Sequence, residues 1–152
     1  MEKSYYKSPI GILKIVCQNN KLVSLKLVDK IKESNANTEL IRNIKTQLDE
    51  YFLGKRKNFD IKISPRGTLF QKEVWNELQK IPSGKTVSYS DIALSIGNKN
   101  AQRAVGSACN KNPIMIIIPC HRVISKNGSM GGFVHGDNVK QKLLGVENCN
   151  FN

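Results

Sequence analysis

The chain has no apolar run long enough to cross a bilayer, since a membrane-spanning helix needs about 20 consecutive apolar residues. Its first six residues, Met1 to Tyr6, also lack the apolar segment of a secretory signal peptide. We therefore expect no membrane-spanning segment, and a location in the cytoplasm or, in a eukaryote, in the nucleus.

The sequence is also poor in cysteine, with four in 152 residues: Cys17, Cys109, Cys120 and Cys149. No two of them stand in a CxxC pair or at a spacing typical of zinc ligands. In a reducing compartment we expect free thiols. The spacing predicts no metal site, and nothing in the chain indicates a cofactor.

Acidic residues are scarce as well, with 12 Asp and Glu against 24 Lys and Arg, which gives a net charge of +12 at pH 7. Residues 1–66 carry a net charge of +7 and residues 67–152 carry +5, so the surplus is not confined to one tail. Such a surplus favours a polyanionic partner, either nucleic acid or an anionic membrane surface. The alternative is a lysine-rich surface that serves only solubility.

The first half of the chain predicts a small unit of strands and one helix. Two runs rich in Ile, Leu and Val, over 10–17 and 22–28, flank a short polar turn and predict a β-hairpin. Apolar residues at helical spacing predict a helix over 40–52, and alternation predicts a further strand over 59–63. A Ser-Pro-Arg-Gly break follows, and we place a domain boundary after residue 66.

The second half predicts mainly helices. One covers 69–78, and two short ones, over 90–96 and 100–108, are joined at a glycine and resemble a helix-turn-helix. An apolar run over 114–118 predicts a buried strand, and a last helix begins near Asp137. Small residues dominate the helix over 100–108, which suits either close approach to a groove or close helix–helix packing.

The most informative residues are Pro119-Cys120-His121-Arg122-Val123, which follow the predicted buried strand. A cysteine beside a histidine at a strand end is a candidate nucleophile, because a thiolate attacks far better than a thiol and imidazole is a base. The alternative is an inert cysteine that packs as a small hydrophobic residue.

Several segments together resemble one family, the O6-alkylguanine-DNA alkyltransferases, also called methylated-DNA–protein-cysteine methyltransferases. They lie in the family's order and at its spacing, over residues 69 to 147. The matching segments are Phe70-Gln71, Val74-Trp75, Ile81-Pro82-Ser83-Gly84-Lys85-Thr86, Ser88-Tyr89, Ile92-Ala93, Arg103-Ala104-Val105-Gly106, Asn112-Pro113, Ile117 to Ile124, Lys140, Leu143-Leu144 and Glu147.

The resemblance implies an α+β fold, with a small N-terminal ribonuclease-H-like α/β domain over 1–66. A C-terminal winged-helix or helix-turn-helix alkyltransferase domain would cover 67–152. It also implies a single-turnover DNA repair enzyme that transfers a methyl or larger alkyl group from O6-alkylguanine in double-stranded DNA to its own cysteine. O4-alkylthymine is a further possible substrate. We expect a monomer that has no membrane partner and that associates with the nucleoid in a bacterial cytoplasm.

The resemblance also assigns roles to four catalytic residues. Cys120 is the alkyl acceptor, and His121 activates it through a bridging water. Glu147 orients His121 and favours its charged form, as a carboxylate beside imidazole does. Asn112 braces the turn around Cys120.

For DNA, the resemblance implies that the target base is flipped out through the minor groove. Arg103 would enter the base stack, and Tyr89 would crowd the 3′ phosphate. The helix that carries Ala101 and Gly106 would lie in the minor groove, where binding depends on salt and weakly on sequence.

By the same resemblance, the substrate pocket would include Val123, Lys140 and the backbone of Val134. Two residues depart from the family pattern: Phe133 stands where most members have tyrosine, and His135 where glycine is common. Phe133 lacks a hydroxyl donor and His135 narrows the pocket, so we expect methyl groups to be accepted better than benzyl groups.

Three alternatives stay open from the sequence. The first is a catalytically silent sensor of alkylated bases, although sensors of that kind replace the acceptor cysteine, usually with tryptophan. The second is a cysteine hydrolase that uses Cys120 and His121, whose base normally lies far away in sequence. The third is a winged-helix DNA-binding regulator with an inert cysteine.

Overall fold

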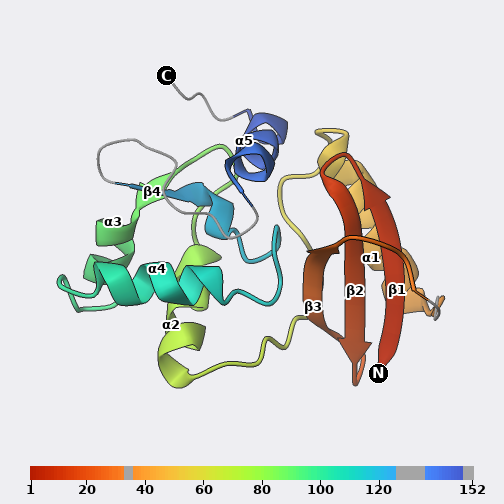
Figure 1. Ribbon diagram of the computed structural model, residues 1–152, viewed down its shortest axis with the longest axis horizontal. Coiled ribbons are helices and arrows are strands. Elements are labelled where there is room, and N and C mark those ends of the chain that lie inside the picture. Colours follow the sequence, from red (N-terminus) through yellow and green to blue (C-terminus); the bar gives the residue numbers. More distant parts are fainter. Residues whose placement is uncertain (33–35, 126–135, 149–152) are drawn as a thin grey trace.

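The computed structural model describes residues 1–32, 36–125 and 136–148 (Figure 1). Strands come first along the chain and helices dominate afterwards. The elements are β1 (Glu2–Ser8), β2 (Gly11–Gln18), β3 (Lys21–Val28), α1 (Glu39–Phe52), α2 (Leu69–Leu78), β4 (Val87–Ser88), α3 (Tyr89–Ser95), α4 (Gln102–Asn110), the 3-10 turn η1 (Cys120–Arg122), β5 (Val123–Ile124) and α5 (Asp137–Val146).

The N-terminal part is an antiparallel meander in the order β1-β2-β3. The predicted hairpin is confirmed as β2 and β3, and its turn consists of Asn19 and Asn20, with φ of 53° and 59°. Asparagine tolerates this left-handed backbone, and two such residues in a row match the right-handed twist of a hairpin. Strand β1 was not predicted, because its mostly polar residues give no clear apolar pattern.

Helix α1 covers one face of this sheet. Leu13 and Ile15 of β2 are fully buried on that face, and Tyr6 of β1 donates a hydrogen bond from its hydroxyl to Asp49 of α1. The Thr38 side chain caps the helix by accepting from the backbone N–H of Ile41. The capping bond satisfies one of the free N–H groups in the first turn, and the sheet and α1 together form the N-terminal layer of the core.

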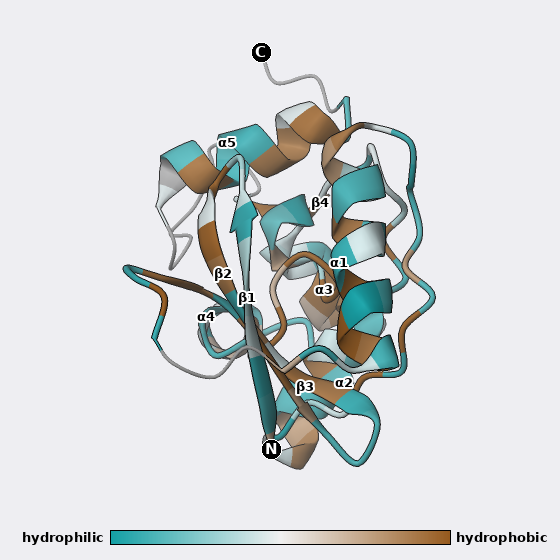
Figure 2. Ribbon diagram, turned by 90° about the vertical axis from the view of Figure 1, so that its right-hand side faces the viewer, coloured by the Kyte–Doolittle hydropathy of each residue, from teal (hydrophilic) through white to brown (hydrophobic). Residues whose placement is uncertain are grey.

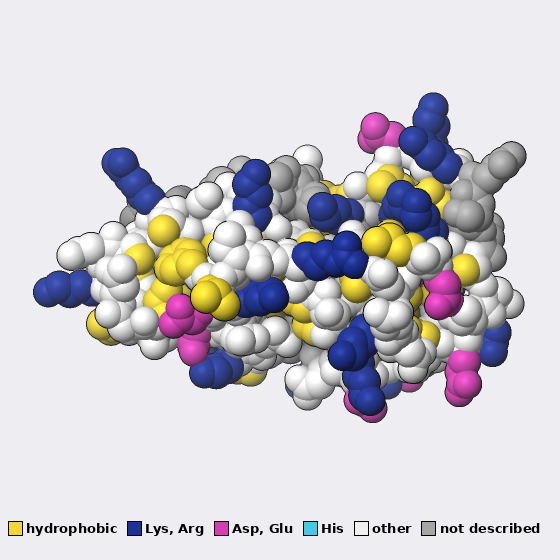
Figure 3. All heavy atoms as spheres, turned by 90° about the horizontal axis from the view of Figure 1, so that it is seen from below, with side chains coloured by type: hydrophobic (Ala, Val, Ile, Leu, Met, Phe, Trp, Pro, Cys, Tyr) yellow, Lys and Arg dark blue, Asp and Glu magenta, His cyan; other side chains and the backbone are white. Residues whose placement is uncertain are grey.

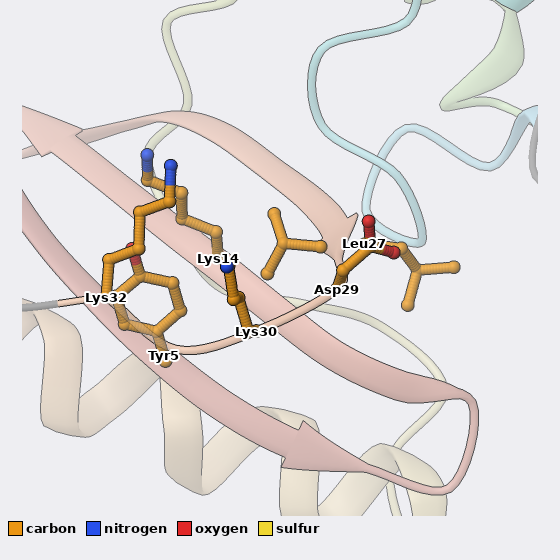
Figure 4. Close-up of a pocket in the computed structure, with 7 residues that line it drawn as sticks. Tyr5, Lys14, Leu27, Asp29, Lys30 and Lys32 are labelled. Atoms are coloured by element: carbon orange, nitrogen blue, oxygen red, sulfur yellow. The ribbon is translucent and has the colours of Figure 1, made fainter.

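The opposite face of the sheet carries a row of cross-strand neighbours, Tyr5, Lys14 and Lys26. A hollow of about 350 Å³ lies beside them, and Figure 4 shows the Lys14, Lys30 and Lys32 side chains around it. The hollow is shallow and basic, and none of the candidate catalytic residues lines it.

Two predicted strands are absent. In the run 59–63, Ile63 alone forms a bridge, parallel to Leu22. In the run 114–118, Ile114 alone does so, with Leu25. Both predictions were wrong because each run reaches the edge of β3 at a single residue.

The segment 114–118 turns instead of extending. Ile116 has a φ of 74°, which is unusual for a β-branched residue. The N–H of Ile117 donates to the carbonyl of Met115, and the N–H of Ile118 donates to that of Ile114. These local bonds bring the chain back toward the core, and Ile114, Met115, Ile116 and Ile118 are buried there.

The C-terminal part is helical, and the predicted helices are confirmed with shifts of one or two residues at their ends. Thr68 with Gln71 caps α2, and Ser88 with Asp91 caps α3, each pair as a reciprocal capping box. The indole Nε1 of Trp75 on α2 donates to the carbonyl of Ala108 on α4 at 2.9 Å. Helix α3 packs against both α2 and α4, so the three helices form one packed group.

The two parts share one core. Buried residues of the sheet, of α1 and of the C-terminal helices form a single apolar cluster. The helices in Figure 2 alternate between hydrophobic and hydrophilic residues, as helices with one buried face do. The last helix, α5, begins at Asp137 as predicted, although Gly136 occupies the cap position without a side-chain bond.

The architecture confirms the predicted α+β class, with a small sheet domain first and a helical domain after it. In Figure 1, α5 lies at the top, between the helical group and the sheet. Within the described ranges, no helix has the length and apolar character to cross a membrane.

Candidate active site around Cys120

Cys120 opens the short turn η1, directly after the bent segment 114–118 and before β5. Its backbone N–H donates to the carbonyl of Ile118 at 2.8 Å, and the N–H of Arg122 donates to that of Pro119 at 3.0 Å. Cys120 is 3% exposed. The turn therefore holds the sulfur rigidly at the edge of the core.

Asn112 contacts the sulfur and also closes the bend that leads to it. Its Oδ1 accepts from the N–H of Ile114 at 2.9 Å. Its Nδ2 donates to the carbonyl of Ile118 at 2.7 Å and lies 3.2 Å from Cys120 Sγ. One buried amide thus ties three points of the loop together.

Burial raises the pKa of the Cys120 thiol above its ordinary value of 9.0. The Asn112 amide, the Lys140 charge and the backbone N–H groups of Cys120 and His121 act in the opposite direction. At neutral pH the resting protein therefore holds a thiol, and the reactive thiolate forms only when a base removes the proton.

Lys140 lies fully buried on α5, and its Nζ donates to the carbonyl of Val123 at 2.5 Å. A buried ammonium is costly unless anions or carbonyl groups face it. Its positive charge favours an anion on Cys120. The sequence resemblance placed Lys140 in the substrate pocket, and the structure adds this electrostatic effect of its charge on the Cys120 thiol.

Glu147, just after α5, is the centre of a buried hydrogen-bond network. Its Oε2 lies 2.7 Å from Nε2 of His121. Arg122 donates from Nε to Oε1 at 2.8 Å and from its second terminal nitrogen to Oε2 at 3.0 Å. The Tyr51 hydroxyl of α1 donates to Oε2 at 2.6 Å. Sequence reasoning predicted the His121 partner but missed Arg122 and Tyr51.

The network fixes the protonation of Glu147. Burial alone would raise the pKa of its carboxyl group, but the hydrogen bonds and charges of His121 and Arg122 outweigh burial and lower the pKa to about 2. Glu147 is therefore an anion that can only accept hydrogen bonds. Nε2 of His121 must then carry the proton that lies between them.

His121 is fully buried, and this desolvation lowers its pKa below the ordinary 6.5, although Glu147 acts to raise it. At neutral pH the imidazole is neutral, with Nε2 protonated and a lone pair on Nδ1. Within the described part of the chain, Nδ1 is the one buried side-chain nitrogen or oxygen atom without a hydrogen-bond partner. An unpaired basic nitrogen of this kind can accept a proton directly or through a water molecule.

The residues assigned to DNA lie on α3 and α4 and at the residue that precedes α4. Tyr89 begins α3, and burial, followed by the nearby Cys109 and Cys120, raises its pKa to about 12. A Cβ atom at Gly106 would lie 3.8 Å from the Tyr89 ring, an ordinary van der Waals distance, so the ring packs beside α4 at this position. Arg103 is exposed near the start of α4, whereas Ala101 is buried at 8% exposure and packs in the core.

Of the assigned pocket residues, Val123 is buried on β5, next to η1. Phe133, Val134 and His135 lie outside the described residues, and so does Cys149. The other two cysteines, Cys17 and Cys109, are buried free thiols. In the ranges that the structure describes, no group of His, Cys, Asp and Glu side chains could hold a metal ion.

Comparison with known proteins identifies the family of the chain. The family model of the 6-O-methylguanine DNA methyltransferase DNA-binding domain matches residues 69–149. The model of the ribonuclease-like domain of the same enzymes matches residues 1–65. The chain belongs to the 6-O-methylguanine DNA methyltransferase family.

Relatives of the methyltransferase family match over almost the whole chain. A methylated-DNA–protein-cysteine methyltransferase of Methanosarcina acetivorans is 42% identical over 97% of this chain and 98% of its own length. The constitutive enzyme of Bacillus subtilis is 38% identical over 97% of this chain and 98% of its own. The crystal structure of Mycobacterium tuberculosis OGT in complex with DNA is 38% identical, with a TM-score of 0.90 over 97% and 93% of the two chains.

The surface of this methyltransferase-family member is basic on both parts of the fold. Figure 3 shows Lys and Arg side chains spread across the face in view, with fewer Asp and Glu side chains among them. The charge is therefore a property of the folded surface, as the even division of charge along the sequence predicts.

Proposed function

We propose that this protein repairs double-stranded DNA by transferring an alkyl group from O6-alkylguanine to Sγ of its own Cys120. One observation carries the proposal. A buried thiol in contact with Asn112 stands next to a neutral histidine, whose Nδ1 has no protein partner and whose Nε2 is held by an ionised carboxylate. This is the arrangement that activates a nucleophile on demand.

The reaction is a displacement at carbon. His121 takes the thiol proton, with a water molecule as the bridge, and the sulfur anion attacks the alkyl carbon. A bond forms between sulfur and that carbon, and the bond between the carbon and guanine O6 breaks with its electron pair on the base. The thiol proton replaces the alkyl group on guanine in the net reaction. The thioether is stable, so each protein molecule reacts once.

The depth of the sulfur requires the base to leave the duplex. Cys120 is 3% exposed, so an alkyl group inside a base stack cannot reach it, and flipping the nucleotide solves this problem. Arg103, exposed on α4, would fill the vacated place in the stack, and Tyr89, beside Gly106, would press on the backbone. Binding should weaken as salt is raised.

The test is mass spectrometry of the intact protein after incubation with duplex DNA that contains one O6-methylguanine. The mass should rise by one methylene unit, and a proteolytic digest should locate the gain on the peptide that contains Cys120. The gain should be absent in Cys120→Ala. Cys17→Ala removes another buried thiol, in the sheet domain, and is expected to react like the wild type. A duplex with O4-methylthymine tests the second substrate.

The sensor and regulator alternatives predict a different result. If the wild-type protein binds the methylated duplex but its mass does not change, the transfer proposal is wrong and a binding role replaces it. If the methyl group is found on a cysteine other than Cys120, the assignment of the acceptor is wrong.

A further inference from the structure

We propose that Tyr51, a residue of the N-terminal sheet domain, is a positioning residue for alkyl transfer, acting on His121 through Glu147. The inference rests on the proposed function, because it assigns Tyr51 to the proton path from Cys120. The segments that resemble the family lie between residues 69 and 147. Through Tyr51, the N-terminal domain would also take part in the chemistry.

The geometry makes Tyr51 a fixed donor. It lies in the last turn of α1 and is 1% exposed. Its ring meets Phe52 edge-on at a centroid distance of 5.1 Å and meets Phe59 at 5.4 Å. Packed between two aromatic rings, the side chain has little rotational freedom. Its hydroxyl donates to Glu147 Oε2 at 2.6 Å across 96 residues of sequence.

The contact matters because Oε2 is shared. The same oxygen lies 2.7 Å from Nε2 of His121 and accepts from Arg122 at 3.0 Å. Each further donor draws electron density from the carboxylate and makes it a weaker acceptor for the imidazole N–H. Tyr51 therefore limits how strongly Glu147 holds a second proton on His121, and it fixes the position of Oε2.

The groups around His121 act on its pKa in opposite directions. Glu147 favours the imidazolium form, while Arg122 of η1 and Lys140 of α5 oppose it, and burial opposes it most. Without the Tyr51 hydroxyl, the attraction of Glu147 for the imidazolium grows. His121 would then stay protonated to a higher pH, and a protonated His121 cannot accept the thiol proton.

The experiment compares Tyr51→Phe with a matched control, Tyr6→Phe. Tyr6 is also in the N-terminal domain, donates from its hydroxyl to a carboxylate of α1, Asp49, and stacks against Phe52 at 6.5 Å. Single-turnover methyl transfer from an O6-methylguanine duplex is measured from pH 4.5 to 9. For Tyr51→Phe, the pH at which the rate reaches half its plateau should rise by about half a unit to one unit. Tyr6→Phe should follow the wild-type curve.

A second readout does not depend on transfer. The ¹⁵N chemical shifts of His121 report its protonation directly, and they can be assigned with a His135→Gln variant, because the chain has two histidines. Tyr51→Phe should raise the pKa of His121 in the same direction as the rate curve. If the wild-type protein transfers no methyl group, the proposed function fails, and this titration still shows separately whether the Tyr51 hydroxyl controls the pKa of His121.

A purely structural role for Tyr51 would give another pattern. Thermal unfolding would occur at a lower temperature in Tyr51→Phe, while the rate curve and the His121 titration would coincide with those of the wild type, and the inference would be overturned. In a Glu147→Gln background, Tyr51→Phe should cause no further shift of either curve. A shift of the same size in that background would also overturn it.

Discussion

Replacement of Glu147 by glutamine tests the buried network most directly, because the change removes one charge and keeps the shape. Four hydrogen bonds end on this carboxylate, from His121, Arg122 and Tyr51. Glutamine can accept only part of them, and it leaves the Arg122 guanidinium buried without its anion. Removing one partner of a buried ion pair lowers the free energy of unfolding by about 3 to 5 kcal/mol. We expect a decrease of that size in Glu147→Gln at pH 7.

The free energy of unfolding of the variant should also depend less on pH in the acid range than that of the wild type. The pKa of Glu147 falls from the ordinary 4.5 to about 2 in the folded state. A lowered folded-state pKa stabilises the fold fully above pH 4.5, and this stabilisation is lost as the pH falls toward 2. At about 1.4 kcal/mol per pH unit, the contribution is on the order of 3 kcal/mol.

Urea unfolding between pH 2.5 and pH 7 measures both effects, with fluorescence of the single tryptophan, Trp75, as the signal. Trp75 is 1% exposed in the core, so its emission reports global unfolding. Glu50→Gln is the matched control, because Glu50 also pairs with an arginine, Arg56, but at the surface. An exposed pair contributes about 0 to 1 kcal/mol.

The reasoning is refuted if Glu147→Gln and the wild type lose stability equally between pH 4.5 and 2.5. Equal slopes would mean that the carboxyl group titrates normally in the folded protein. A stability at pH 7 equal to that of the wild type would mean that Arg122 does not depend on its partner.

Three further predictions concern the thiol and the DNA. Lys140→Met removes the charge that lowers the pKa of Cys120 and should slow methyl transfer about tenfold at pH 7 but less at pH 9; equal slowing at both values would contradict this electrostatic role. Asn112→Ala should lower the free energy of unfolding by about 1 to 3 kcal/mol and slow transfer, and an unchanged transfer rate would show that the bend holds Cys120 without the amide. Arg103→Ala should slow transfer from duplex DNA while the reaction with free O6-methylguanine base stays as in the wild type; equal loss with both substrates would place the effect at Cys120 instead.

Most local elements, and the resemblance to the family, follow from the sequence alone. The hairpin of β2 and β3 follows from apolar runs around an Asn-Asn turn, and the helices follow from apolar spacing and their caps. Cys120 and His121 are neighbours in the chain, so their proximity needs no folding to be recognised. The resemblance then supplied Glu147 and Asn112.

The surroundings of these residues, in contrast, depend on tertiary packing. The apolar sequence of the run 114–118 is typical of a strand, but the run pairs with β3 at one residue only. Local hydrogen bonds then turn the chain, and Cys120 follows at the edge of the core. Tyr51 and Glu147 are separated by 96 residues, and no periodicity links them. Their contact arises because α1 and the end of α5 pack into one core. Burial, which sets the protonation of Cys120, His121 and Glu147, depends on every element packed around them and cannot be obtained from local sequence.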